Sequence, residues 1–270
     1  MTEILIALAV VAAVGVLAGI MLALASHFFY VPENPTATAI REALPGVNCG
    51  ACGYAGCDEY AKAVAEDGVA PNLCIPGAKD SAEQIAAILG VEIDEPVDLV
   101  AFVSCNGNND ATIFKAVYDG INTCSAASMY YAGPAACRFG CIGCGDCLEV
   151  CPSNAICIRG GIAHIHSQIC IGCTLCSKTC PKGIIKMLPR EAKVAVMCSS
   201  HDKGAVARKA CERACIACGK CAKSCPEGAI TVENNIARID YSKCTGCKTC
   251  AEVCPTNCIR ITDFFNGKIE

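Results

Sequence analysis

Cysteine is the residue type in this sequence whose number and spacing could do chemistry. The 270 residues include 27 cysteines, and four groups of them repeat the pattern Cys-x2-Cys-x2-Cys-x3-Cys followed by proline. Three closely spaced thiolates can wrap one [4Fe–4S] cluster, while the cysteine before proline can reach a second cluster. The groups are Cys141, Cys144, Cys147 and Cys151; Cys170, Cys173, Cys176 and Cys180; Cys215, Cys218, Cys221 and Cys225; and Cys244, Cys247, Cys250 and Cys254.

The residues between these cysteines also suit iron–sulfur chemistry. A two-residue gap lets successive thiolates converge on adjacent irons, and small residues such as Gly143, Gly172 and Ala217 let the backbone donate N–H groups to sulfur. Zinc is the main alternative, but a zinc site of four cysteines usually pairs two Cys-x2-Cys units that lie far apart. Disulfides would not require the same spacing four times. The spacing therefore favours clusters.

The four groups form a tandem repeat, because the first cysteines lie 29 residues apart in each pair, Cys141 to Cys170 and Cys215 to Cys244. Short β segments alternate with the cysteine loops, an α+β pattern similar to the two-cluster ferredoxin fold, in which the fourth ligands cross. The expected ligand sets are Cys141, Cys144, Cys147 and Cys180; Cys170, Cys173, Cys176 and Cys151; Cys215, Cys218, Cys221 and Cys254; and Cys244, Cys247, Cys250 and Cys225.

A fifth group, Cys49, Cys52, Cys57 and Cys74, has a different spacing. Glycines crowd it, at positions 50, 53 and 56. Because glycine lets the backbone approach closely, this group predicts a further cluster, with zinc as the alternative.

Seven cysteines remain. Cys157 and Cys258 align with Thr231 and Ile184 of the other module, so we expect both to be small core residues. The other five raise two alternatives, a sixth cluster or buried thiols without metal. They are Cys105, Cys124, Cys137, Cys198 and Cys211.

The N-terminal segment carries no charge from Ile4 to Ser26. As a helix it would be about 35 Å long, enough to cross a hydrocarbon core of about 30 Å, so we expect a transmembrane helix. Phe28, Phe29 and Tyr30 would form an aromatic collar at the interface. A signal peptide would need a basic start and a shorter apolar run, which disfavours that alternative.

Composition limits the remaining functions. A net charge of −4 argues against a nucleic-acid binder, and 53% hydrophobic residues exclude a disordered chain. Residues 31–133 carry a net charge of −10 and residues 134–270 a net charge of +7. Neither a Gly-x-Gly-x-x-Gly loop after a strand nor a Walker loop occurs, so we assign no catalytic residue and no nucleotide site.

These patterns divide the chain into six parts. We expect a membrane anchor at 1–30, a four-cysteine domain at 31–98, a connecting segment at 99–136, ferredoxin module 1 at 137–190, a second connecting segment at 191–210 and ferredoxin module 2 at 211–270.

The order of these parts resembles the B subunits of the Rnf complex, a membrane-bound ferredoxin:NAD oxidoreductase coupled to Na⁺ or H⁺ translocation. The residues that carry the resemblance are the apolar N-terminus, the segment LPGVNCGACGYAGC with Cys74, and the ferredoxin modules. Shorter members have one module and this chain has two. The resemblance implies an electron-transfer subunit with five [4Fe–4S] clusters on the twenty grouped cysteines, membrane partner subunits and a soluble ferredoxin as donor.

Bacterial ferredoxins are generally acidic, so basic residues of the second half could steer such a donor. The candidates are Lys203, Lys209, Lys220, Lys223, Lys243 and Lys248. Since low-potential clusters are kept in reducing compartments, we expect a single-pass protein of the cell inner membrane with its bulk in the cytoplasm. Two alternatives stay open, a related membrane redox complex with another acceptor and an iron–sulfur scaffold or storage protein.

Overall fold

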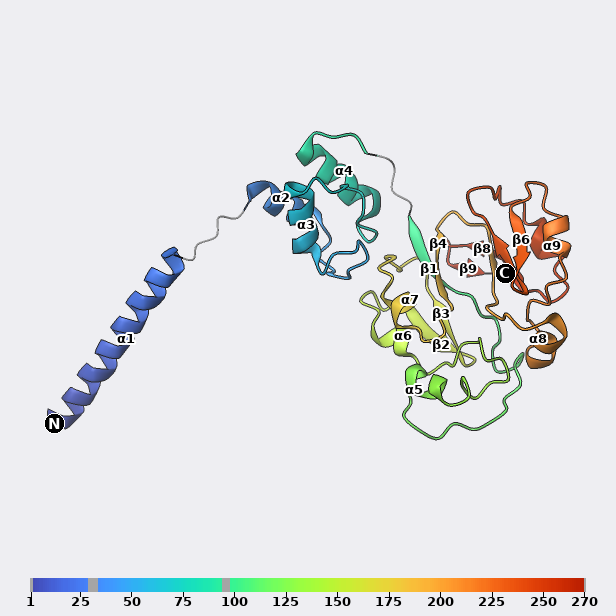
Figure 1. Ribbon diagram of the computed structural model, residues 1–270, viewed down its shortest axis with the longest axis horizontal. Coiled ribbons are helices and arrows are strands. Elements are labelled where there is room, and N and C mark those ends of the chain that lie inside the picture. The colour runs from blue at the N-terminus through green and yellow to red at the C-terminus, as the bar shows by residue number, and fades with distance from the viewer. Residues whose placement is uncertain (1, 29–33, 94–97, 270) are drawn as a thin grey trace.

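The computed structural model describes residues 2–28, 34–93 and 98–269 (Figure 1). Its first helix, α1 (Thr2–Phe28), contains the uncharged run from Ile4 to Ser26. Among the described residues, no helix is long and apolar enough to cross a membrane. The side chains of α1 at positions 2–5, 7–8 and 10–11 are not among the described ones. Phe29 and Tyr30 of the expected collar, and the boundary expected at residues 30–31, also lie outside the described residues.

Three helices form the unit that carries the first cysteines: α2 (Pro35–Ala43), α3 (Cys57–Glu66) and α4 (Ala78–Leu89). The Asn34 side chain caps α2 by accepting a hydrogen bond from the Thr36 N–H at 3.0 Å, with proline at the first helical position. Ile40, Tyr60 and Ile85 contribute one side chain from each helix to a core in which each is at most 1% exposed.

Ferredoxin module 1 is built on two antiparallel strand pairs. β2 (Ile156–Arg159) and β3 (Ile162–Ile165) form a hairpin whose turn residues, Gly160 and Gly161, have φ of +54° and +77°. Such a two-residue turn needs positive φ at both positions, which glycine adopts without strain. The other pair joins β1 (Leu99–Val103) to β4 (Ile185–Pro189). Three short helices complete the module: α5 (Cys124–Met129), α6 (Asp146–Glu149) and α7 (Leu175–Thr179).

Ferredoxin module 2 repeats this plan. β6 (Ile230–Glu233) and β7 (Ile236–Ile239) form the hairpin, and β5 (Val194–Val196) pairs with β8 (Ile259–Asp263), which also pairs with β9 (Lys268–Ile269). The helices are α8 (Gly204–Ala210), α9 (Lys220–Lys223) and α10 (Thr249–Glu252).

The segments 99–136 and 191–210, expected to be connecting segments, are more than connectors. Each begins with a strand, β1 or β5, that pairs with the last long strand of the module that follows it. The pairing partners lie about ninety and sixty-five residues further along the chain, so no local pattern announces them. Each module therefore extends further toward the N-terminus than the cysteine repeat indicates.

The two modules pack against each other through an apolar core of their own. Val100, Phe102 and Leu188 from module 1 meet Met197 and Phe264 from module 2. The rings of Phe102 and Phe264 are edge to face at 5.9 Å, and the Ser199 hydroxyl donates a hydrogen bond to the Ser104 carbonyl at 2.9 Å. The modules thus form one continuous body.

The three-helix core gives a matched pair of isoleucines for testing. Ile85 is 0% exposed and Ile88, one turn later on α4, is 40% exposed. Ile85→Ala should lower the free energy of unfolding of this unit by about 2–5 kcal/mol, because it removes buried methyl groups and leaves a cavity. Ile88→Ala should change it by less than about 1 kcal/mol. Thermal denaturation of the two variants compares them, and equal losses would contradict the packing of α4.

Candidate metal centres

The four cysteines nearest the N-terminus surround one cavity. Cys49, Cys52, Cys57 and Cys74 all line it, together with Gly50 and Tyr60. Cys57 is the first residue of α3, and its N–H donates to Asn48 Oδ1 at 2.8 Å. The sequence predicted these four cysteines as ligands but not the contact with Asn48, because an asparagine nine residues away carries no spacing signal.

Tyr60 fixes the segment that carries Cys74. Its hydroxyl donates to the Ala70 carbonyl at 2.8 Å and accepts from the Leu73 N–H at 3.1 Å. The side chain is 1% exposed, and burial raises its pKa to about 12. Burial also raises the pKa of Cys74, to about 11, so a metal would have to displace its proton at neutral pH.

In module 1, one cavity is lined by cysteines from both repeats, and we call it the inner cavity. Cys141 and Cys147 line it together with Cys180, which comes from the second repeat. Cys124 lines it too, and Cys144 lies beside Cys124. Burial is the largest cause of the rise in the Cys144 pKa to about 11, and the electrostatic effect of Cys124 is the next largest.

The other thiol set of module 1 shows the reciprocal exchange. Cys176 interacts electrostatically with Cys170, Cys173 and Cys151, the last from the first repeat. Burial is the largest cause of the rise in the Cys176 pKa to about 12, and the neighbouring cysteines add to it. Cys151 therefore lies with the three thiols of the second repeat, and Cys180 with Cys141 and Cys147 of the first, while Cys144 does not line the inner cavity.

Module 2 has the same crossed arrangement. Cys215, Cys218, Cys221 and Cys254 line one cavity, and Cys250 interacts with Cys244, Cys247 and Cys225. Two cysteines of module 2, Cys218 and Cys247, are exposed at the surface.

Backbone N–H groups point at several of these sulfurs. Ala155 N–H donates to Cys151 Sγ at 3.3 Å, Ala163 N–H to Cys141 Sγ at 3.5 Å and Cys258 N–H to Cys254 Sγ at 3.2 Å. Such donors stabilise negative charge on cluster thiolates and tune the reduction potential.

Cysteines of these sets line cavities. A [4Fe–4S] cluster binds each thiolate through a different iron, so its cysteines surround a volume instead of converging on a point. Within residues 2–28, 34–93 and 98–269, no group of three or more His, Cys, Asp or Glu side chains is arranged to hold a metal ion.

The seven other cysteines separate into distinct environments. Cys258 is 1% exposed in the module 2 core, and its thiol contacts Cys198 and Cys215. Cys157 is only half-buried, with Sγ 3.5 Å from His166 Nε2. Cys105, Cys137, Cys198 and Cys211 gather at the junction of the modules, whereas Cys124, expected with them, lies instead at the inner cavity of module 1.

The three-helix unit and module 1 touch at their thiol sets. Lys178 Nζ donates to the Gly50 carbonyl at 3.0 Å, and Cys173 lies within electrostatic range of Cys49. The set that contains Cys49 is therefore the neighbour of the module 1 set that contains Cys173.

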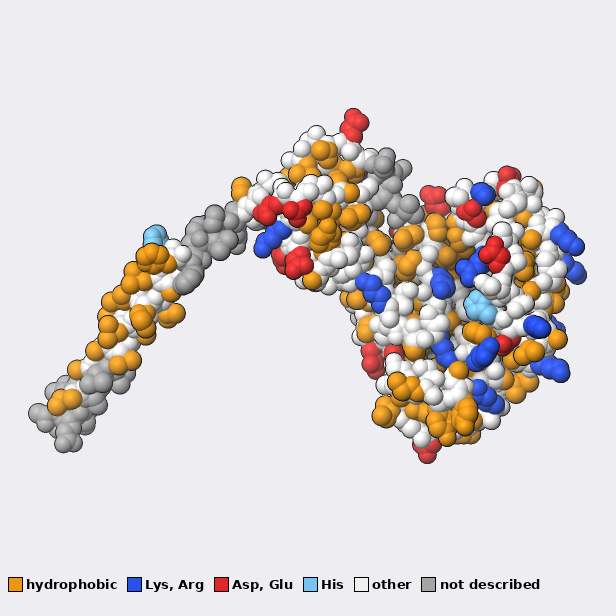
Figure 2. Space-filling view, viewed as in Figure 1, with side chains coloured by type: hydrophobic (Ala, Val, Ile, Leu, Met, Phe, Trp, Pro, Cys, Tyr) orange, Lys and Arg blue, Asp and Glu red, His pale blue; other side chains and the backbone are white. Residues whose placement is uncertain are grey.

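The six lysines expected to face a partner are all exposed. Lys220 and Lys223 belong to α9 and Lys248 follows the exposed Cys247, while Lys243 pairs with Asp240 at 3.5 Å. Figure 2 shows Lys and Arg side chains over the C-terminal half of this face and Asp and Glu near α2–α4.

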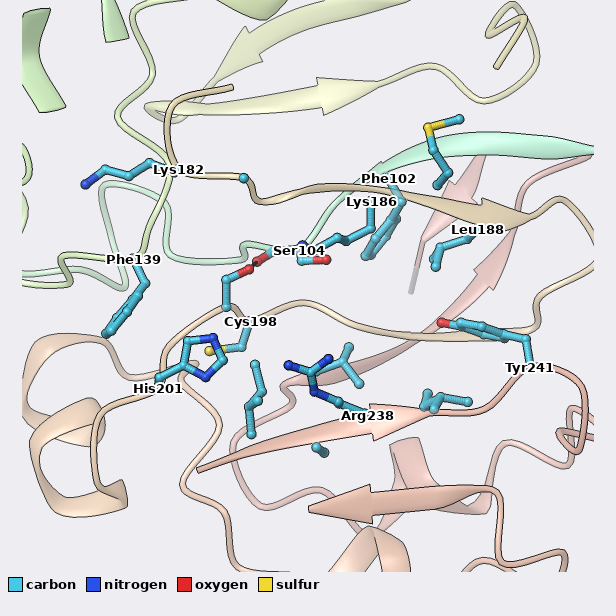
Figure 3. Close-up of a pocket in the computed structure, with 17 residues that line it drawn as sticks. Phe102, Ser104, Phe139, Lys182, Lys186, Leu188, Cys198, His201, Arg238 and Tyr241 are labelled. Carbon is cyan, nitrogen blue, oxygen red and sulfur yellow. Dashed lines mark hydrogen bonds between the residues drawn. The ribbon is translucent and has the colours of Figure 1, made fainter. Parts of the chain in front are cut away.

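A cavity of about 550 Å³ lies between the modules, and sequence reasoning did not anticipate it. Lys186 and Leu188 of β4 lie on one wall, Arg238 and Tyr241 on the other, and Cys198 at one end (Figure 3). Its lining comes from both modules, including β4 of module 1 and β7 of module 2, so the residues that form it lie far apart in the sequence and no local motif marks it.

Fold and thiol sets together define a multi-cluster iron–sulfur protein of the ferredoxin type. An Fe-S cluster family model matches residues 44–76, and models for a 4Fe-4S dicluster domain match residues 140–184, 169–230 and 209–261.

Several characterised relatives, all B subunits of ion-translocating complexes, are similar over most of the chain. The one from the Na(+)-translocating ferredoxin:NAD(+) oxidoreductase complex of Acetobacterium woodii is 41% identical, across 96% of this chain and 78% of the relative. The one from the proton-translocating ferredoxin:NAD(+) oxidoreductase complex of Clostridium ljungdahlii is 43% identical, across 90% and 87%. The one from the ion-translocating oxidoreductase complex of Methanosarcina acetivorans is 38% identical, across 90% and 93%. This chain belongs to the family of Rnf complex B subunits, which are iron–sulfur electron-transfer subunits of an oxidoreductase.

The Tyr60 hydroxyl gives a test of the first site. Tyr60→Phe should raise hydrogen exchange at residues 70–74, because Leu73 N–H and the Ala70 carbonyl lose a buried partner at a cost of about 1–3 kcal/mol. Tyr54→Phe makes the same change on the neighbouring ring, 5.5 Å away, and should have a smaller effect. Equal exchange rates in the two variants would contradict this role of Tyr60.

Proposed function

We propose that the twenty grouped cysteines hold five [4Fe–4S] clusters, with the fourth ligands crossed in each module. The sets are Cys49, Cys52, Cys57 and Cys74; Cys141, Cys144, Cys147 and Cys180; Cys170, Cys173, Cys176 and Cys151; Cys215, Cys218, Cys221 and Cys254; and Cys244, Cys247, Cys250 and Cys225. The observation that carries this assignment is the exchange of Cys151 with Cys180 and of Cys225 with Cys254 between repeats.

Clusters at these positions would supply transfer of one electron at a time. The residues of the chain space the sites and tune them. Burial of Cys147 and Cys176 disfavours added negative charge, while N–H donors to Cys141 and Cys151 favour it. The chain thus acts as a conductor whose potentials depend on local burial and hydrogen bonding.

The electron donor is a reduced soluble ferredoxin that docks on module 2. Cys218 and Cys247 reach the surface there, and exposed lysines flank them at positions 220, 223 and 248. A positive surface around an exposed redox site attracts an acidic partner and raises the association rate.

Electrons leave at the opposite end, from the Cys49 set. This set lies beside Cys173 of module 1 and follows α1 along the chain. Residues Ile4–Ser26 form a single transmembrane anchor in the cell inner membrane, supported by the complete lack of charge in that run, and the thiol-rich bulk lies in the reducing cytoplasm. Because one helix cannot line an ion pathway, the translocation of Na⁺ or H⁺ that is coupled to NAD reduction belongs to membrane partner subunits.

The anchor can be tested by its removal. The full chain, produced without partner subunits, should stay with membranes under alkaline carbonate extraction, because about 20 apolar residues suffice to span a bilayer. A chain beginning at Asn34 should be soluble and keep the same iron content per chain. Recovery of the full chain in the soluble fraction would contradict the anchor.

Donor docking can be tested by charge reversal. The triple variant Lys220→Glu, Lys223→Glu and Lys248→Glu should slow reduction by ferredoxin at low salt about tenfold or more, and flatten the salt dependence. Stopped-flow absorbance measures the rate. Lys62→Glu, on α3 of the three-helix unit, serves as the control and should leave it unchanged. A triple variant as fast as the unmodified chain at low salt would overturn this docking site.

A further inference from the structure

Four cysteines outside the five sets meet where the two modules join. Cys105 follows β1 and Cys198 follows β5, while Cys137 and Cys211 each lie four positions before the first cysteine of their module. Each module therefore contributes the same two positions. The site is complete only when both modules are present.

The sulfurs are close enough to surround one small group. A Cβ atom placed on Gly107 would lie 3.2 Å from Cys211 Sγ and 3.7 Å from Cys105 Sγ. A Cβ atom placed on Gly140 would lie 3.7 Å from Cys137 Sγ and 3.8 Å from Cys105 Sγ. Cys137 is also within electrostatic range of Cys198 and Cys211. All four thiols thus belong to one cluster of side chains.

Backbone donors serve these sulfurs as they serve the other sets. Cys141 N–H donates to Cys105 Sγ at 3.4 Å, and the N–H groups of Ser200 and Cys215 donate to Cys198 Sγ, each at 3.4 Å. Hydrogen bonds of this kind to cluster sulfurs tune the reduction potential.

Small residues surround Cys211. Ala111, Ala207 and Ala214 pack around Cys211 and are each at most 4% exposed. A methyl group on Gly107 would lie 3.0 Å from Thr112 Oγ1 and 3.2 Å from Cys211 Sγ, closer than most real contacts. Only small side chains therefore fit beside the Cys211 thiol.

We propose that Cys105, Cys137, Cys198 and Cys211 hold a sixth [4Fe–4S] cluster that relays electrons between the two modules. The position suits a relay, because Cys198 contacts the backbone of Cys215 and Cys105 that of Cys141, the first cysteines of the two inner sets. The reaction is outer-sphere transfer of single electrons supplied by reduced ferredoxin: each site is reduced as its neighbour is oxidised, and no bond forms or breaks.

This inference rests on the proposed function, and metal analysis separates the two. Iron, acid-labile sulfide and zinc are measured per chain in the anaerobically purified full chain and in Cys105→Ala, Cys211→Ala and the control Cys157→Ala. The unmodified chain and the control should hold about 24 iron atoms, and each of the other variants about 20. Reduction of the Cys49 site by ferredoxin should slow in both variants, since the relay between modules is lost.

An unmodified chain with about 20 iron atoms, unchanged in Cys105→Ala and Cys211→Ala, would overturn the sixth cluster and leave the proposed function intact. One zinc per chain that both variants lose would also overturn it, in favour of a structural zinc site. A chain almost free of iron would overturn the proposed function itself. The count for the unmodified chain decides between these outcomes even where a variant fails to fold.

Discussion

Burial of thiol groups is the constraint on which both ferredoxin modules depend. The chain lacks Trp and has 5% aromatic residues, so cysteine shares the core with isoleucine and valine. Burial raises the pKa of Cys147 and Cys176 to about 12, which makes a bare thiolate unfavourable there. Iron bound at these sulfurs would replace the proton with a cation, so the proposed clusters would link folding to metal loading in these modules.

The same cysteines also set the spatial order of the chain. The crossed fourth cysteines tie the two repeats of each module together, while the pairs β1–β4 and β5–β8 bring each connecting segment onto its module. Cys218 shares a cavity with Cys215, whose N–H donates to Cys198; the Cys141 N–H donates to Cys105; and Cys173 lies near Cys49. This order matches the proposed direction from a soluble donor to a membrane acceptor.

The spacing of residues predicted the features that depend on residues close together in the sequence. The Cys-x2-Cys-x2-Cys-x3-Cys repeats predicted crossed cysteines, a prediction with which the lining of the module 2 cavity and the neighbours of Cys176 agree, and the family was correctly identified from the same repeats. What depends on distant parts of the chain was missed. Pairing of β1 and β5, the cavity between modules and the hydrogen bonds of Tyr60 all join residues that no periodic pattern connects. The place of Cys124 at the inner cavity of module 1 also depends on a contact between distant residues, because its N–H donates to Asp146 at 2.6 Å.

The central claim is that these thiols bind polynuclear iron–sulfur clusters, and Mössbauer spectroscopy of the full chain labelled with ⁵⁷Fe tests it most directly. The account predicts that the oxidised protein shows iron in the mixed-valence, diamagnetic state of [4Fe–4S]²⁺ clusters, and that reduced ferredoxin converts it to the paramagnetic form. Mononuclear iron bound by four thiolates, or zinc in place of iron, would contradict the account.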